Sequence, residues 1–130
     1  MRFTATLIAI AFALPAFTVA AQATTYGAQL EGFDYPHAVK RHELQSQGEP
    51  LHMAYMDVPA AKPNGRTVVL LHGKNFCAAT WESAIAALTR AGYRVIAPDQ
   101  VGFCKSGKPA HYQYSFHQLA ANTRALLQSL

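Results

Sequence analysis

Two short aliphatic runs, Thr67–Leu71 and Tyr93–Ala97, dominate the middle of this 130-residue sequence. Neither run alternates strictly between polar and apolar residues, which is typical of strands that are covered on both faces of a sheet. The segment between them predicts a helix from about Thr80 to Ala91, and Gly92 suits the left-handed position that ends a helix. A strand, a helix and a second strand at this spacing predict a right-handed crossover between parallel strands.

Two further elements flank this crossover. Val39–Ser46 and Leu51–Val58 read as strands, and the turn residues between them predict an antiparallel hairpin. A second helix is expected from Ser115, because Ser115 and Gln118 form a capping box that satisfies free N–H groups at a helix start. The apolar faces expected to be buried are Trp81, Ile85 and Leu88 in the first helix, and Phe116, Leu119, Thr123 and Leu126 in the second.

Each strand of the predicted crossover ends in a loop that carries polar residues and glycine. The first is followed by His72-Gly73-Lys74-Asn75-Phe76, and the second by the segment from Pro98 to Ser106. In parallel sheets the loops at the carboxyl ends of the strands build the binding site. Gly73 would let the backbone approach a ligand closely. The sequence therefore predicts a site between these two loops.

These features together resemble the amino-terminal part of the α/β-hydrolase family. The resemblance covers about Val39 to Leu130 and rests on one set of residues: His72-Gly73, Trp81, and the run from Gly92 to Asp99 with Gly102, Phe103 and Ser106. It implies an α/β fold with a partial α/β-hydrolase sheet, in which an antiparallel hairpin precedes parallel strands joined by a crossover helix.

The resemblance also implies that the catalytic residues lie elsewhere. In the family the nucleophile lies in a Gly-x-Ser-x-Gly elbow after the next strand, and an acid and a histidine follow it along the chain. No such elbow occurs in these 130 residues. We therefore expect a fragment that is truncated before the nucleophile elbow and that is inactive by itself.

Within the loops, the resemblance implies one catalytic donor. The backbone N–H of Lys74 would donate to the oxyanion that develops in acyl transfer, and Asn75 could add a side-chain donor. His72 is expected to orient the loop by hydrogen bonding. The alternative is that His72-Gly73 only turns the chain. The residues expected to be structural near the site are His72, Gly73, Asp99, Gly102 and Ser106.

The sequence has two cysteines, Cys77 and Cys104, one in each of the two loops. An oxidising compartment would permit a disulfide between them, and such a bond would join the loops beside the site. The alternative is a pair of buried free thiols.

Cofactor and metal sites are not expected. The run from Gly102 to Lys108 nearly fits a phosphate-binding P-loop, but Pro109 stands where Ser or Thr must contact the metal. The six histidines show no metal-ligand spacing. The formal net charge is +4, but the basic residues do not form a continuous stripe, which argues against nucleic-acid binding.

The first 23 residues read as a cleavable signal peptide. Arg2 precedes an apolar core, Pro15 ends that core, and Ala21-Gln22-Ala23 offers a small-x-small cleavage site. The run is too short for a typical membrane-spanning helix, so no stable insertion is expected after cleavage; the alternative is an uncleaved tether. The predicted organisation is a signal peptide over 1–23, an irregular arm over 24–38, and the incomplete hydrolase domain over 39–130, in a periplasmic or secreted protein.

Two function classes remain open. The first is a secreted, cofactor-free hydrolase of an ester, amide or related carbonyl substrate, serine-type by the family's usual pattern, although a nucleophilic aspartate as in epoxide hydrolases and dehalogenases stays possible. The second is a non-catalytic relative that binds a small ligand or a partner. The partner expected for the full-length protein is a small-molecule substrate. The sequence does not specify an oligomeric state.

Overall fold

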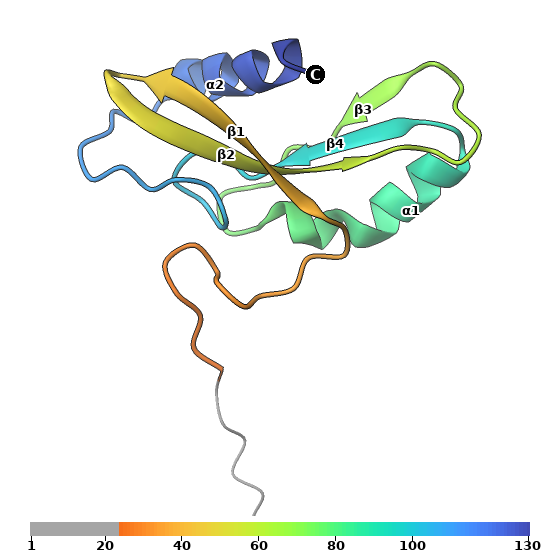
Figure 1. The fold of residues 1–130 in the computed structure, drawn as a ribbon, viewed down its shortest axis with the longest axis horizontal. Helices are drawn as coiled ribbons and strands as arrows, with labels where there is room; N and C mark the ends of the chain where they lie inside the picture. The colour runs from red at the N-terminus through yellow and green to blue at the C-terminus, as the bar shows by residue number, and fades with distance from the viewer. Residues whose placement is uncertain (1–23) are drawn as a thin grey trace, which may run out of the picture.

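The computed structural model describes residues 24–130, and the predicted signal peptide, residues 1–23, lies outside them. Four strands form one mixed sheet, and a helix packs on each of its faces (Figure 1). In chain order the elements are β1 (Val39–Ser46), β2 (Glu49–Val58), β3 (Thr67–Val69), the 3₁₀ turn η1 (Ala78–Trp81), α1 (Glu82–Arg90), β4 (Arg94–Pro98) and α2 (Phe116–Gln128).

The sheet has the strand order β1-β2-β4-β3. β2 pairs antiparallel with both β1 and β4, whereas β3 pairs parallel with β4. The predicted hairpin and the predicted parallel crossover are therefore both confirmed. Because β3 and β4 are parallel neighbours, the loops that leave their carboxyl ends lie at the same edge of the sheet.

The hairpin turn is tighter than the sequence suggests. Ser46 pairs with Glu49, so only Gln47 and Gly48 form the loop, and β2 begins two residues earlier than expected. Both loop residues have positive φ, 53° and 81°. Two-residue hairpin loops favour this left-handed geometry because it matches the twist of the flanking strands.

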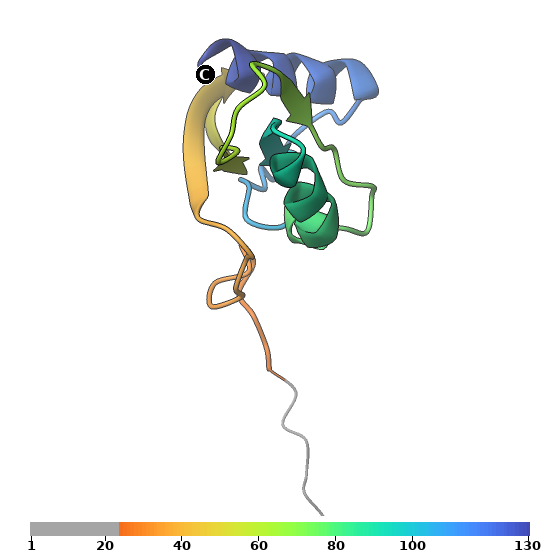
Figure 2. The ribbon, with the colours of Figure 1, turned by 90° about the vertical axis from the view of Figure 1, so that its right-hand side faces the viewer.

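Alternate residues of the two central strands pack against different helices, which explains their continuous apolar sequence. Met53, Tyr55 and Ile96 belong to the cluster that contains Leu126 of α2. The opposite cluster contains Ile85 of α1 together with residues from the other faces of the strands: Met56, Val95 and Ala97. Figure 2 shows α1 and α2 on opposite sides of the sheet. Both faces of the sheet are buried, as parallel strands require.

The first helix begins later than predicted. Residues 78–81 form η1, and α1 starts at Glu82. Ile85 is fully buried, and Trp81 and Leu88 pack partly buried beside it, so the predicted face of this helix is confirmed. Gly92 has a φ of 93°, and an added Cβ would lie 2.9 Å from the carbonyl oxygen of Lys62. Glycine is required there by both conformation and space.

The predicted buried face of the second helix is confirmed at Thr123 and Leu126, and Leu119 is half-buried, but the face does not include Phe116. Ser115 accepts a hydrogen bond from the N–H of Gln118 (3.1 Å), as a capping residue should. The Gln118 side chain does not complete the capping box, because its Nε2 donates to Ser46 and Asn122. Phe116 is 90% exposed, so its assignment to the inner stripe is wrong. The buried residues of α2 are Asn122, Thr123 and Leu126.

Residues 24–38 form an arm without strand or helix. Its aromatic rings stack edge to face, Tyr26 on Phe33 and Phe33 on Tyr35. Gln29 in the arm accepts a hydrogen bond from Arg41 of β1 (3.0 Å). The arm thus contacts β1 through the side chain of Gln29. Among the described residues, no helix is long and apolar enough to cross a bilayer.

Candidate active site

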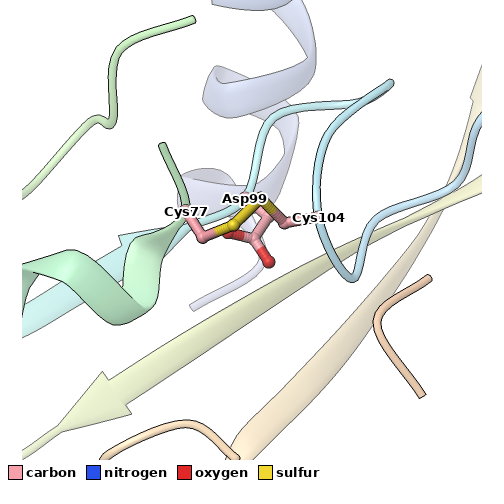
Figure 3. Close-up of side chains that lie close together, drawn as sticks. All are labelled: Cys77, Asp99 and Cys104. Atoms are coloured by element: carbon pink, nitrogen blue, oxygen red, sulfur yellow. A yellow bond between two sulfur atoms is a disulfide. The ribbon is translucent and has the colours of Figure 1, made fainter. Parts of the chain in front are cut away.

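Two loops form the candidate site. We call residues 70–77, which follow β3, the β3 loop, and residues 99–109, which follow β4, the β4 loop. A disulfide joins Cys77 at the end of the first to Cys104 in the second, with a Cα–Cα distance of 5.8 Å and a sequence separation of 27 (Figure 3). The two cysteines are therefore bonded to each other, and neither is a free thiol.

Asp99 is fully buried beneath this disulfide and contacts both loops (Figure 3). Its Oδ1 accepts the N–H of Ala78 (2.7 Å), the residue after Cys77. Its Oδ2 accepts the N–H of Lys105 (3.1 Å), the residue after Cys104. The same Oδ2 accepts the hydroxyl of Tyr35 in the arm (2.6 Å). Buried carboxylates are stable only when donors surround them, and Asp99 has three.

Ser106 connects the β4 loop to the sheet. Its buried Oγ donates to the main-chain carbonyl of Asp99 (2.7 Å) and accepts the N–H of Ala54 in β2 (2.8 Å). Gly107 then donates its N–H to the carbonyl of His52 (3.0 Å). Asp99 and Ser106 both occupy the interior of the loop, where their side chains bond the backbone.

Gly102 permits the tight course of the β4 loop. Its φ is 93°, and its N–H donates to the carbonyl of Gly107 (2.8 Å), which closes the loop on itself. A Cβ at this position would lie 2.5 Å from the hydroxyl oxygen of Tyr114. Any other residue would therefore be both strained and crowded.

His72 of the β3 loop forms hydrogen bonds within its own loop and to the β4 loop. Its Nε2 accepts the N–H of Gln100 (2.9 Å), which leaves Nδ1 to carry the proton and donate to the carbonyl of Gly73 (2.8 Å). The ring also packs edge to face against Phe103. These contacts define the tautomer, because the acceptor nitrogen cannot carry a hydrogen. Both ring nitrogens of His72 are therefore occupied by hydrogen bonds within the protein.

Lys74 and Asn75 are exposed at the tip of the β3 loop. The loop contains a turn in which the N–H of Phe76 donates to the carbonyl of Gly73 (3.1 Å). Among residues 24–130, no group accepts a hydrogen bond from the backbone N–H of Lys74. No hydrogen bond to the side-chain amide of Asn75 is present among the same residues either. A Cβ on Gly73 would meet only Phe76, at 3.5 Å, so the protein's own packing does not require glycine there.

The β4 loop does not have the geometry of a phosphate site. A P-loop directs backbone N–H groups toward the anion. Here the ammonium group of Lys108 bonds the carbonyls of Cys104 and Ser106, and that of Lys105 bonds the carbonyl of Leu30 (3.0 Å). The backbone N–H groups of the loop are bonded within the protein as well, those of Phe103 and Ser106 to the carbonyls of Gln100 and Phe103 and that of Lys105 to Asp99, so they do not point toward an anion site.

Metal ligation is also unsupported by the arrangement of the described side chains. Cys77, Asp99 and Cys104 place their ligand atoms within 4.8 Å of one another, and they are the single group of potential ligands at that spacing in the described part of the chain. The two sulfurs are bonded to each other, however, and a metal needs the thiolate form.

An open groove of about 670 Å³ runs beside the site, between the end of β3 and α2. His72 and Gln100 lie at one end of it. Gln100 is held there by Thr123 of α2, to which its Nε2 donates (3.0 Å). The apolar side chains that line the groove are Leu71, Phe116, Leu119 and Leu127. The groove is therefore mostly apolar, with polar groups at the loop end.

Sequence reasoning missed the contribution of the arm. Tyr35 is 64 residues from Asp99, and nothing local indicates that its hydroxyl bonds that carboxylate. Burial and the neighbouring Asp99 carboxylate both raise the pKa of Tyr35 above its ordinary value, so its hydroxyl stays protonated and donates. Gln100 was missed as well, because its role depends on both His72 and α2.

The comparison with protein families gives a direct match. The model of the alpha/beta hydrolase fold matches residues 66–130, which include β3, α1, β4, α2 and both site loops. The chain belongs to the α/β-hydrolase fold family. The mixed strand order and the crossover of this hydrolase domain agree with that assignment.

Solved and curated relatives support the same family. The α/β-hydrolase chain is 66% identical to a probable hydrolytic enzyme from Pseudomonas aeruginosa PAO1, with a TM-score of 0.82 over 84% of this chain and 35% of that one. It is 39% identical over 74 residues to epoxide hydrolase A of Mycobacterium tuberculosis, covering 56% of this chain and 23% of the relative. A haloalkane dehalogenase of Mycolicibacterium paratuberculosis is 36% identical over 88 residues, 65% of this chain and 29% of that protein.

Proposed function

We propose that residues 24–130 are the amino-terminal part of an exported hydrolase of ester, amide or related carbonyl substrates, in which the N–H of Lys74 is one donor to the oxyanion. The observation that carries this proposal is the Lys74 amide. It lies exposed at the carboxyl end of β3, without a hydrogen-bond acceptor among the described residues, in a loop joined to the core by His72, Asp99 and a disulfide. Preorganised amides of this kind stabilise charge that develops in a transition state.

The proposed reaction needs a nucleophile that this sequence does not contain. No Gly-x-Ser-x-Gly elbow occurs in the 130 residues, so we propose that the chain by itself does not turn over substrate. The chain spans about a quarter of the curated relatives that it matches, 23% and 29% for the two compared above. Those two are an epoxide hydrolase and a haloalkane dehalogenase. An aspartate nucleophile is therefore retained as the alternative to a serine nucleophile.

A chimera tests the proposal. Residues 24–130 replace the matching segment of the Pseudomonas aeruginosa relative, which is 66% identical, and ester hydrolysis is measured. In the chimera, Lys74→Pro removes the N–H, whereas Lys74→Ala removes only the side chain. We expect Lys74→Pro to lower kcat about a hundredfold with little change in KM, because the lost bond forms in the transition state.

The Lys74→Ala chimera is the control and should retain the kcat of the parent chimera. Asn75→Ala separates the side-chain donor from the backbone donor. If Lys74→Pro and Lys74→Ala have equal kcat in chimeras that melt at the same temperature, the Lys74 amide is not an oxyanion donor. A chimera that folds but does not hydrolyse an ester that the unmodified Pseudomonas aeruginosa protein hydrolyses would instead count against the hydrolase assignment of this segment.

We also propose that the protein is exported to the periplasm or secreted. The apolar run before Ala23 and the disulfide between Cys77 and Cys104 support this, because structural disulfides persist in oxidising compartments. We expect the protein recovered from the periplasm of a bacterial host to begin at Thr24, as read by amino-terminal sequencing. Recovery of the unprocessed chain in the cytosol would contradict export.

A further inference from the structure

The β3 and β4 loops are linked at one place by two kinds of bond. The disulfide joins Cys77 to Cys104. The residues that directly follow these cysteines, Ala78 and Lys105, donate their N–H groups to the two oxygens of Asp99. The Asp99 carboxylate thus links the same two chain segments by hydrogen bonds that the disulfide links covalently.

The arm supplies the third donor to this carboxylate. Tyr35 donates its hydroxyl to Asp99 Oδ2 (2.6 Å), and its ring lies under the ammonium of Lys105, 5.1 Å from the ring centroid. Lys105 also donates to the carbonyl of Leu30 in the arm (3.0 Å). Tyr35 therefore contacts both the carboxylate and the residue that follows Cys104.

We propose that Asp99 and Tyr35 keep the Cys77–Cys104 disulfide in its oxidised state, with Tyr35 as the positioning residue that orients the carboxylate between the two loops. After reduction, the two thiols stay close only if other bonds keep the loops together. The Asp99 bonds do so, and a high effective concentration of one thiol beside the other favours the disulfide. The carboxylate also lies within 4.8 Å of both sulfurs, and its negative charge disfavours the thiolates that reduction would release.

The test measures the reduction equilibrium of the disulfide in the full chain at low micromolar concentration. In buffers of reduced and oxidised dithiothreitol, the Sγ–Sγ bond breaks as the dithiol closes to its cyclic disulfide, and two electrons and two protons pass to the cysteine sulfurs. Thiol labelling and mass spectrometry then give the reduced fraction. We expect Tyr35→Phe to shift the equilibrium about tenfold toward the dithiol, which is about 30 mV for this two-electron couple.

Tyr26→Phe is the matched control. It makes the same chemical change in the same arm, at a ring that packs on Phe33 and whose hydroxyl has no hydrogen-bond partner among residues 24–130. It should leave the equilibrium unchanged. Asp99→Asn removes the negative charge and should shift the equilibrium further toward the dithiol than Tyr35→Phe does. If Asp99→Asn does not fold, the comparison of Tyr35→Phe with wild type is sufficient to test the inference.

Equal reduced fractions in wild type and Tyr35→Phe, or equal shifts in Tyr35→Phe and Tyr26→Phe, would overturn the inference. Amide hydrogen exchange gives a second readout, since Ala78 and Lys105 should exchange faster in Tyr35→Phe. Neither measurement depends on hydrolysis. A failure here is therefore distinguishable from a failure of the Lys74 proposal.

Discussion

Replacing Asp99 by alanine is expected to destabilise the protein by about 3–5 kcal/mol. The substitution removes the acceptor of three hydrogen bonds, from Ala78, Lys105 and Tyr35, at a fully buried position. Each buried donor left without a partner costs about 1–3 kcal/mol. Because a domain of this size is stable by only about 5–15 kcal/mol, this loss is a large fraction of the total.

Urea denaturation followed by circular dichroism measures this effect. The midpoint should fall while the slope of the transition stays near that of the wild type. Asp34→Ala is the matched control, because Asp34 is a carboxylate of the neighbouring arm that is exposed. It should change the free energy of unfolding by less than about 0.5 kcal/mol. A loss below about 1 kcal/mol in Asp99→Ala would mean that the Asp99 bonds do not stabilise the fold.

Removing the disulfide is the second large change. Replacing both Cys77 and Cys104 by alanine frees a closed loop with a sequence separation of 27 residues. The entropy that this loop gains in the unfolded chain corresponds to about 3.5 kcal/mol of lost stability. Thermal unfolding monitored by circular dichroism should show a lower midpoint for the double variant than for the oxidised wild type.

Reductant provides the internal control for this experiment. Wild type treated with excess dithiothreitol should unfold at nearly the midpoint of the double variant, and the double variant itself should not respond to reductant. If oxidised and reduced wild type unfold at the same temperature, the disulfide contributes nothing to the stability of the folded state.

The hairpin and the parallel crossover follow from local patterns, which is why they could be predicted. Val69 and Ile96 pack into one core cluster, whereas their neighbours Leu70 and Val95 pack into the opposite one, because helices cover both faces of the sheet. The family resemblance then indicated which loops meet and which residues lie in them. The cysteines lie in those same loops, so their proximity followed from the topology.

The surroundings of α2 could not be predicted from the same patterns. An apolar residue at the helix start was expected to be buried, yet Phe116 is exposed. A polar network determines the rotation of the helix: Asn122 bonds both Ser46 of β1 and Tyr112. A pattern of apolar spacing identifies Thr123 and Leu126, but it treats Asn122 as a surface residue and so misses the polar part of the buried face.

The position of Tyr35 has the same kind of explanation. A hydrogen bond between an irregular arm and a buried carboxylate 64 residues away has no periodic signature. The residues of the candidate site were named from the loops, but the bonds that orient those loops come from the arm, from β2 and from α2. Such bonds depend on how the elements pack, and no local pattern encodes them.

The two outer strands of the sheet differ in how readily they could accept a further strand. β1 carries Lys40, Arg41 and Glu43 along its outer part, and charged side chains discourage pairing with another chain. β3 is Thr67-Val68-Val69, uncharged, and in the described chain it pairs with β4 only. An additional strand would therefore pair more readily with β3, beside the site loops, than with β1 at the hairpin side of the sheet.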